Sequence, residues 1–107
     1  MDTNNIADAV TLSKAIRERS FEMHFPDCST DEELLEVLGK FVLYLLDKQP
    51  ERLWQILYRL DVDEMQVKQV LMNEQNDNEA GMGKALAQLV IEREKKRQYY
   101  RQQYARD

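Results

Sequence analysis

The chain has few of the residues that break helices and few of those that build catalytic or metal sites. Its 107 residues include only three glycines and two prolines, which favours long helices joined by short turns. The single cysteine, Cys28, excludes an internal disulfide and is typical of a reduced, partly buried thiol in a cytoplasmic protein. The single histidine, His24, leaves no set of side chains for a Ser/His/Asp or Cys/His catalytic site.

The sequence also lacks membrane and export signals. Residues 1–14 contain neither the basic stretch nor the apolar stretch of a signal peptide. The longest uninterrupted apolar run is FVLYLL, residues 41–46, whereas a helix that crosses a bilayer needs about 20 apolar residues. We therefore expect a soluble cytoplasmic protein with no membrane partner.

The patterns of cofactor sites are missing as well. His24 and Cys28 offer two potential zinc ligands, but a structural zinc site needs four nitrogen or sulfur ligands. The polar stretch at residues 73–88 lacks the glutamate that closes a calcium-binding EF-hand loop. The glycines of GMGKA, residues 81–85, do not have the spacing of a phosphate-binding loop. We expect no metal, no cofactor and no enzymatic activity.

What the chain does contain is enough apolar material for one core. Hydrophobic residues make up 43% of the sequence and charged residues 33%, and a chain of this length is typical of one domain, here residues 1–107. The predicted fold class is all-α: a compact bundle of four to five helices with a long basic C-terminal helix. The predicted core residues are Leu34, Leu38, Phe41, Val42, Leu45, Leu53, Trp54, Leu57, Leu60, Val67, Leu71, Leu86 and Leu89.

Apolar spacing and capping signals place the helices. The first is predicted at residues 5–19, capped within residues 3–5, and the second at about 31–48, capped by Ser29 or Thr30 in a capping-box pattern. A loop follows the first helix, and we expect its apolar residues to fold back onto the core: Phe21, Met23 and Phe25. The remaining predictions are a third helix that begins at Pro50, a fourth with Asp61 as its N-cap, and a last helix from about Asn78 to about Gln103.

The last helix is basic, although the net charge of the whole chain is -5. Residues 84–107 carry seven Lys and Arg against three Asp and Glu, whereas residues 61–83 carry one against six. A helix over residues 78–103 is about 39 Å long at 1.5 Å per residue. The expected body is roughly 30–35 Å across, so we expect residues 93–107 to form an overhanging tail.

Tyrosine and arginine, the residue types enriched at protein interfaces, gather in this tail. We therefore interpret the chain as a small non-enzymatic interaction protein whose C-terminal helix binds a protein partner or a second copy in a homodimer. The acidic segment at residues 61–83 offers the complementary charge. The predicted interaction residues are Arg93, Arg97, Tyr100, Arg101 and Tyr104.

The alternative function is a nucleic-acid-binding accessory protein that uses the same helix. Its cations would neutralise phosphates and its tyrosines would stack on bases, but the rest of the chain is acidic. Residues 56–73 have the outline of a helix-turn-helix, yet the second helix would begin with Asp63 and Glu64, which phosphates repel. A third interpretation is that the last helical turns are simply exposed to solvent.

Two segments resemble a group of short uncharacterised bacterial all-helical proteins. They are LYRLDVDE at residues 57–64 and LVIEREKKR at residues 89–97, and the resemblance covers residues 53–97 at most. It implies a compact helical domain and indicates no particular activity.

Overall fold

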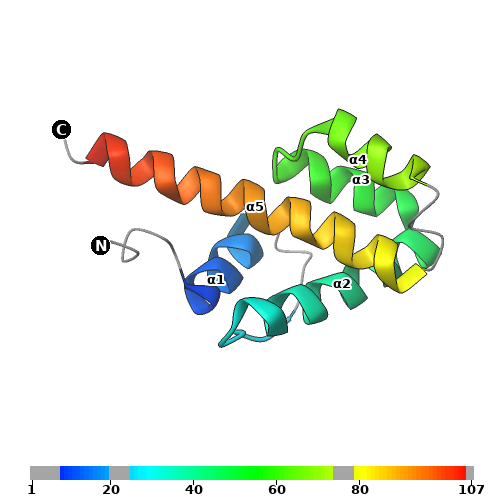
Figure 1. The fold of residues 1–107 in the computed structure, drawn as a ribbon, viewed down its shortest axis with the longest axis horizontal. Coiled ribbons are helices and arrows are strands. Elements are labelled where there is room, and N and C mark those ends of the chain that lie inside the picture. Colours follow the sequence, from blue (N-terminus) through cyan, green and yellow to red (C-terminus); the bar gives the residue numbers. More distant parts are fainter. Residues whose placement is uncertain (1–7, 20–24, 74–78, 106–107) are drawn as a thin grey trace.

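The computed structural model describes residues 8–19, 25–73 and 79–105, and it folds them into five α-helices without a strand (Figure 1). In chain order the helices are α1 (Ala9–Arg19), α2 (Asp31–Lys48), α3 (Pro50–Arg59), α4 (Glu64–Met72) and α5 (Glu79–Ala105). The all-α class predicted from the sequence, with a long last helix, is confirmed.

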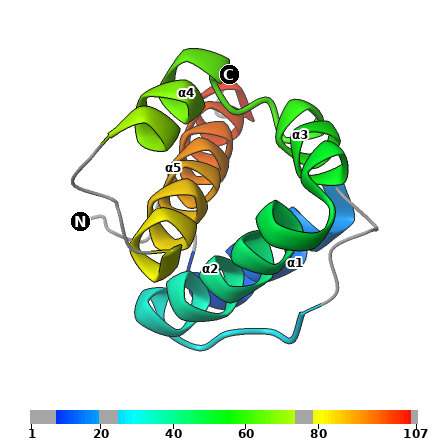
Figure 2. The ribbon, with the colours of Figure 1, turned by 90° about the vertical axis from the view of Figure 1, so that its right-hand side faces the viewer.

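The longest helix, α5, lies in the middle of the fold. It packs most extensively on α2 and also packs on α4 and α1, while α3 packs on α2 (Figure 2). The molecule measures 43 × 27 × 25 Å, and α5 runs roughly along the longest of these directions (Figure 1). All other helices except α3 therefore take their main positions from contacts with α5.

The start of α2 follows the predicted capping signal. Thr30 Oγ1 accepts a hydrogen bond from the Glu33 backbone N–H at 3.0 Å, and the Glu33 carboxylate accepts one from the Ser29 N–H at 2.9 Å. The first bond satisfies an N–H group that the helix itself leaves without a partner, and the second ties Glu33 to the residue before the cap. Pro50 is the first residue of α3, as predicted.

Two other helix starts differ from the prediction. The caps predicted within residues 3–5 lie outside the described residues, and Asp8 caps α1 by accepting a hydrogen bond from the Thr11 N–H at 2.8 Å. The N-cap of α4 is Asp63, which accepts from the Met65 N–H at 3.0 Å, so the prediction of Asp61 was wrong. Asp61 instead takes a left-handed backbone conformation, φ 62°, just after α3.

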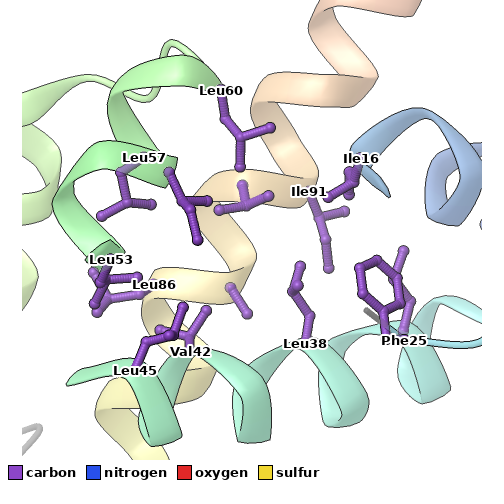
Figure 3. Packing of buried hydrophobic residues seen from close by; sticks show 14 of the residues in the cluster. Ile16, Phe25, Leu38, Val42, Leu45, Leu53, Leu57, Leu60, Leu86 and Ile91 are labelled. Carbon is purple, nitrogen blue, oxygen red and sulfur yellow. The ribbon is translucent and has the colours of Figure 1, made fainter. Parts of the chain in front are cut away.

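Side chains from all five helices form one hydrophobic cluster. Figure 3 shows how labelled members from α1, α2, α3 and α5 converge on each other. Most predicted core residues are buried, but Trp54 is 39% exposed, and three others are only partly buried: Phe41, Leu71 and Leu89. The predicted core list omits several residues that are buried: Leu12, Ile16, Ile56, Val90 and Ile91.

The segment before α2 closes one side of this core. Phe25 is buried as predicted, and the Arg17 guanidinium lies 5.6 Å from the centre of its ring. Phe21 and Met23 lie outside the described residues. Cys28 is buried, and its N–H donates to Ser13 Oγ at 3.1 Å. Burial raises the pKa of the Cys28 thiol, which keeps it in the unreactive protonated form.

Two glycines allow α2 and α5 to approach closely. A Cβ atom at Gly83 would lie 2.7 Å from the Gly39 carbonyl oxygen and 3.2 Å from Leu43 Cβ. The oxygen belongs to the backbone of α2 and cannot move aside without moving the helix. Gly83 is therefore required by the close packing of the two helices that form the largest contact in the fold.

Candidate interaction surface

A buried carboxylate sits in the second half of α5. Glu94 is only 1% exposed. Its Oε1 accepts hydrogen bonds from Arg19 Nε at 2.9 Å and Arg97 Nη1 at 2.8 Å, and its Oε2 accepts one from Gln98 Nε2 at 2.8 Å. A buried charge is tolerated only when it is paired and hydrogen-bonded, and these contacts meet both conditions. The cluster attaches the end of α1 to α5.

Two arginines of α5 bind the end of α3. Arg97 Nη2 donates to the Leu60 carbonyl at 3.0 Å, and Arg93 Nε donates to the Asp61 carbonyl at 3.0 Å. The last carbonyls of a helix lack donors within the helix and carry partial negative charge, so cations are favourable there.

Arg93 also pairs with the side chain of Asp61. Its Nη2 lies 2.7 Å from Asp61 Oδ2. This hydrogen bond from Arg93, together with its positive charge, lowers the pKa of the Asp61 carboxyl. Asp61, the residue with the left-handed backbone conformation, is therefore held by a specific partner on α5, Arg93.

These contacts place the overhang of α5 later than the sequence suggested. Lys95 pairs with Asp31 at 3.1 Å, so side chains on the body still hold α5 well beyond residue 93. Tyr99 and Tyr100 are half exposed, at 50% and 48%, and Arg101 is exposed. The overhang begins near Tyr99, and Figure 1 shows these last turns of α5 extending past the other helices.

Most of the positive charge on α5 is neutralised by acids of the same chain. Four of its described Lys and Arg side chains form ion pairs within the chain: Lys84, Arg93, Lys95 and Arg97. Among the described residues, Lys96 and Arg101 form none. The basic segment therefore offers much less free charge than its sequence implies.

An open groove of about 580 Å³ lies between the start of α4 and the second half of α5. Its floor includes the partly buried Leu89 and Val62. The α5 side contributes Leu89, Glu92, Arg93, Lys96 and Tyr100, and the α4 side contributes Asp61, Val62, Asp63 and Gln66. We call this the α4/α5 groove.

A second, more apolar cleft of about 340 Å³ lies between α3 and α4. Trp54 and Tyr58 line it, with Leu57, Val62 and Val67. Tyr58 is 86% exposed. The sequence placed Trp54 in the core, but it lies about 100° around α3 from Leu53, at the side of the buried face. On a helical wheel centred on Leu53 and Leu57, both Trp54 and Tyr58 lie away from the centre of the buried face.

The predicted interaction residues have different surroundings. Arg93 and Arg97 bind the body of the same chain, Tyr100 lines the α4/α5 groove, and Arg101 is exposed on the overhang. The side chain of Tyr104 lies outside the described part. Two groove residues, Glu92 and Lys96, were not predicted, although their spacing from Leu89 and Tyr100 puts all four on one helix face.

The described residues contain no group of three or more His, Cys, Asp and Glu side chains arranged to hold a metal ion, and His24 lies outside them. None of the helices in the described ranges is long and apolar enough to cross a membrane. Comparison of the chain with protein-family models, with curated proteins and with solved structures finds no significant match.

Proposed function

We propose that this protein is a small non-enzymatic interaction domain that binds another protein chain through the α4/α5 groove and the exposed end of α5. The observation that carries the proposal is the pair of half-exposed tyrosines, Tyr99 and Tyr100, whose ring centres lie 5.6 Å apart in an edge-to-face arrangement. The proposal assigns this function to the cytoplasm, because a single buried thiol fits a reducing compartment.

Burial of these rings would supply binding energy without new folding. A tyrosine buries about 150–250 Å² when it is fully covered. Covering the exposed half of one tyrosine side chain would therefore contribute on the order of 2 kcal/mol to binding. The helix that carries the rings is already held by Glu94 and Arg97. A partner would therefore meet a pre-ordered surface, and the entropy cost of binding would be small.

Nucleic acid is the weaker alternative. Phosphate binding needs cations that are free to replace counterions, and only Lys96 and Arg101 are without an ion pair among the described residues of α5. Acids line the same groove: Asp61, Asp63 and Glu92. This mixture of signs favours a protein surface, which also carries both signs.

Site-specific photo-crosslinking tests the proposal. A photoreactive phenylalanine analogue replaces Tyr100 in one version of the chain and Tyr44 in another, and each version is irradiated in extract from cells of the natural source. Tyr44 on α2 is the matched control, because it is also a tyrosine with a similar exposure of 54%. We expect a discrete protein adduct from position 100 and none from position 44. Equal adducts from both positions, or none from position 100, would contradict the proposed function.

A further inference from the structure

We propose that the partner of the α4/α5 groove is α5 of a second copy of this chain, laid antiparallel to the first so that the two chains form a symmetric dimer. The inference rests on the proposed function, because it names the partner for the same surface. It is carried by the order of side chains along the groove and by two charged groove residues that form no ion pair with any other described residue.

The α5 residues of the groove form one stripe. Leu89, Glu92, Arg93, Lys96 and Tyr100 all line it, and at 100° per residue they fall within an arc of about 100° on the helix. Glu94 lies on the other side of the helix, in its buried cluster with Arg19. The stripe is therefore separate from the Glu94 cluster, and only Arg93, at one edge of the stripe, binds Asp61 of its own body.

This stripe is self-complementary when it is read in the opposite direction. In an antiparallel pair, Leu89 of one copy faces Tyr100 of the other, and Glu92 faces Lys96. Both pairings have their midpoint near residue 94, so a single two-fold axis beside that residue produces each pairing twice. A symmetric interface requires this property, because the same patch must fit itself.

The two charged side chains involved, Glu92 and Lys96, form no ion pair within the described part of the chain. Glu92 accepts a hydrogen bond from Gln88 at 3.0 Å, and Lys96 is exposed. Although they are four residues apart on one helix, no ion pair joins them, and neither forms one with another described residue. Each copy thus presents one acid and one base, neither of them in an ion pair with a described residue, at the positions that the two-fold axis brings together.

Other charged residues in and next to the groove also favour the antiparallel pairing. Asp63 lies at the α4 edge without an ion pair among the described residues, and the exposed Arg101 follows Tyr100 on the overhang. No acid occurs between residues 95 and 106. The basic end of one α5 would therefore lie beside an acidic edge of the other copy. Figure 1 shows that the last turns of α5 extend past the other helices.

Charge-reversed variants test the pairing directly. Multi-angle light scattering and sedimentation equilibrium measure the mass and the dissociation constant of the wild type, of Glu92→Lys and of Lys96→Glu. The wild type should reach twice the chain mass of 12.7 kDa. In either variant both intermolecular pairs join like charges, so we expect the dissociation constant to rise at least about tenfold, or roughly 1.4 kcal/mol.

Mixing the two variants provides the decisive step. A heterodimer of Glu92→Lys with Lys96→Glu restores opposite charges in both pairs, so the mixture should regain the wild-type affinity, and so should the double variant alone. Glu18→Lys and Lys14→Glu are the controls. They make the same charge changes at exposed positions four residues apart on α1 and should leave the dimer unchanged.

Three results would overturn the inference: a wild type that stays monomeric at every concentration, a dimer that the groove variants do not weaken, or variants that mixing does not rescue. These failures differ from a failure of the proposed function. A monomeric chain whose position 100 still crosslinks to a different protein would keep the interaction function and reject the second copy as its partner. A monomeric chain without that crosslink would reject both.

Discussion

Replacement of Glu94 by alanine should destabilise the protein strongly. The carboxylate is 1% exposed and accepts charge-assisted hydrogen bonds from Arg19 and Arg97 and a third hydrogen bond from Gln98. A hydrogen bond to a charged group contributes about 1.5–3 kcal/mol, and loss of one partner of a buried pair costs about 3–5 kcal/mol. Because the guanidinium side chains keep 27% and 17% of their exposure, solvent offsets part of that cost. We expect the free energy of unfolding to fall by about 2–4 kcal/mol.

Urea unfolding followed by circular dichroism measures this loss, and thermal unfolding should show a lower midpoint by roughly 10–25 °C. Glu18→Ala is the matched control. Glu18 is also a helical glutamate, but it is exposed on α1 and lies outside the proposed dimer surface. Its replacement should change the free energy of unfolding by no more than about 0.5 kcal/mol. If Glu94→Ala costs as little as Glu18→Ala, then water screens the cluster and burial of Glu94 contributes little to stability.

Three further substitutions test the close helix contact and the end of α3. Gly83→Ala should lower the free energy of unfolding by about 1–2 kcal/mol, because overpacking against the Gly39 carbonyl outweighs the gain in helix propensity. Gly39→Ala, whose new methyl group would meet the flexible Lys84 side chain at 3.2 Å, should be neutral or stabilising in the same urea assay. Asp61→Asn should lower stability at neutral pH. Since Arg93 lowers the pKa of folded Asp61, the contribution of this pair is present above the unfolded value of about 3.9 and disappears as the pH falls through the folded value. The stability difference between wild type and Asp61→Asn should therefore vanish in acid, and a difference independent of pH would exclude the ion pair as its cause.

The helices whose boundaries depend on nearby residues could be predicted well. The bounds of α2 follow from Thr30, from the acidic first turn and from a continuous apolar stripe, all within the helix or next to it. The start of α3 follows from Pro50 for the same reason. The start of α4 could not be chosen from the sequence, because Asp61 and Asp63 are both good caps. Contact with Arg93, 32 residues away, accompanies the left-handed conformation of Asp61 and leaves the cap to Asp63.

The candidate site was harder to predict, because its charges depend on distant partners. Arg93 and Arg97 interrupt the apolar stripe of α5, and the sequence suggested that they face a partner. In the fold they bind the carbonyl groups at the end of α3, and Arg97 also pairs with buried Glu94. No periodic pattern reveals that Glu94 meets Arg19, which is 75 residues away. Whether the predicted tail residues contact another protein stays a prediction, with Tyr100 and Arg101 in the exposed positions.

The continuity of α5 has a mechanical consequence. The same helix forms the centre of the core and the overhang. After Gly83 it contains neither glycine nor proline, the residues at which helices usually bend. A partner bound to the overhang would therefore be held at a fixed direction and distance from the core. Reorientation would require α5 to slide or roll against α2, where Gly83 lies too close to the Gly39 carbonyl for even a Cβ atom to fit. The length and direction of α5 would therefore set the distance between the core and any chain bound at its end.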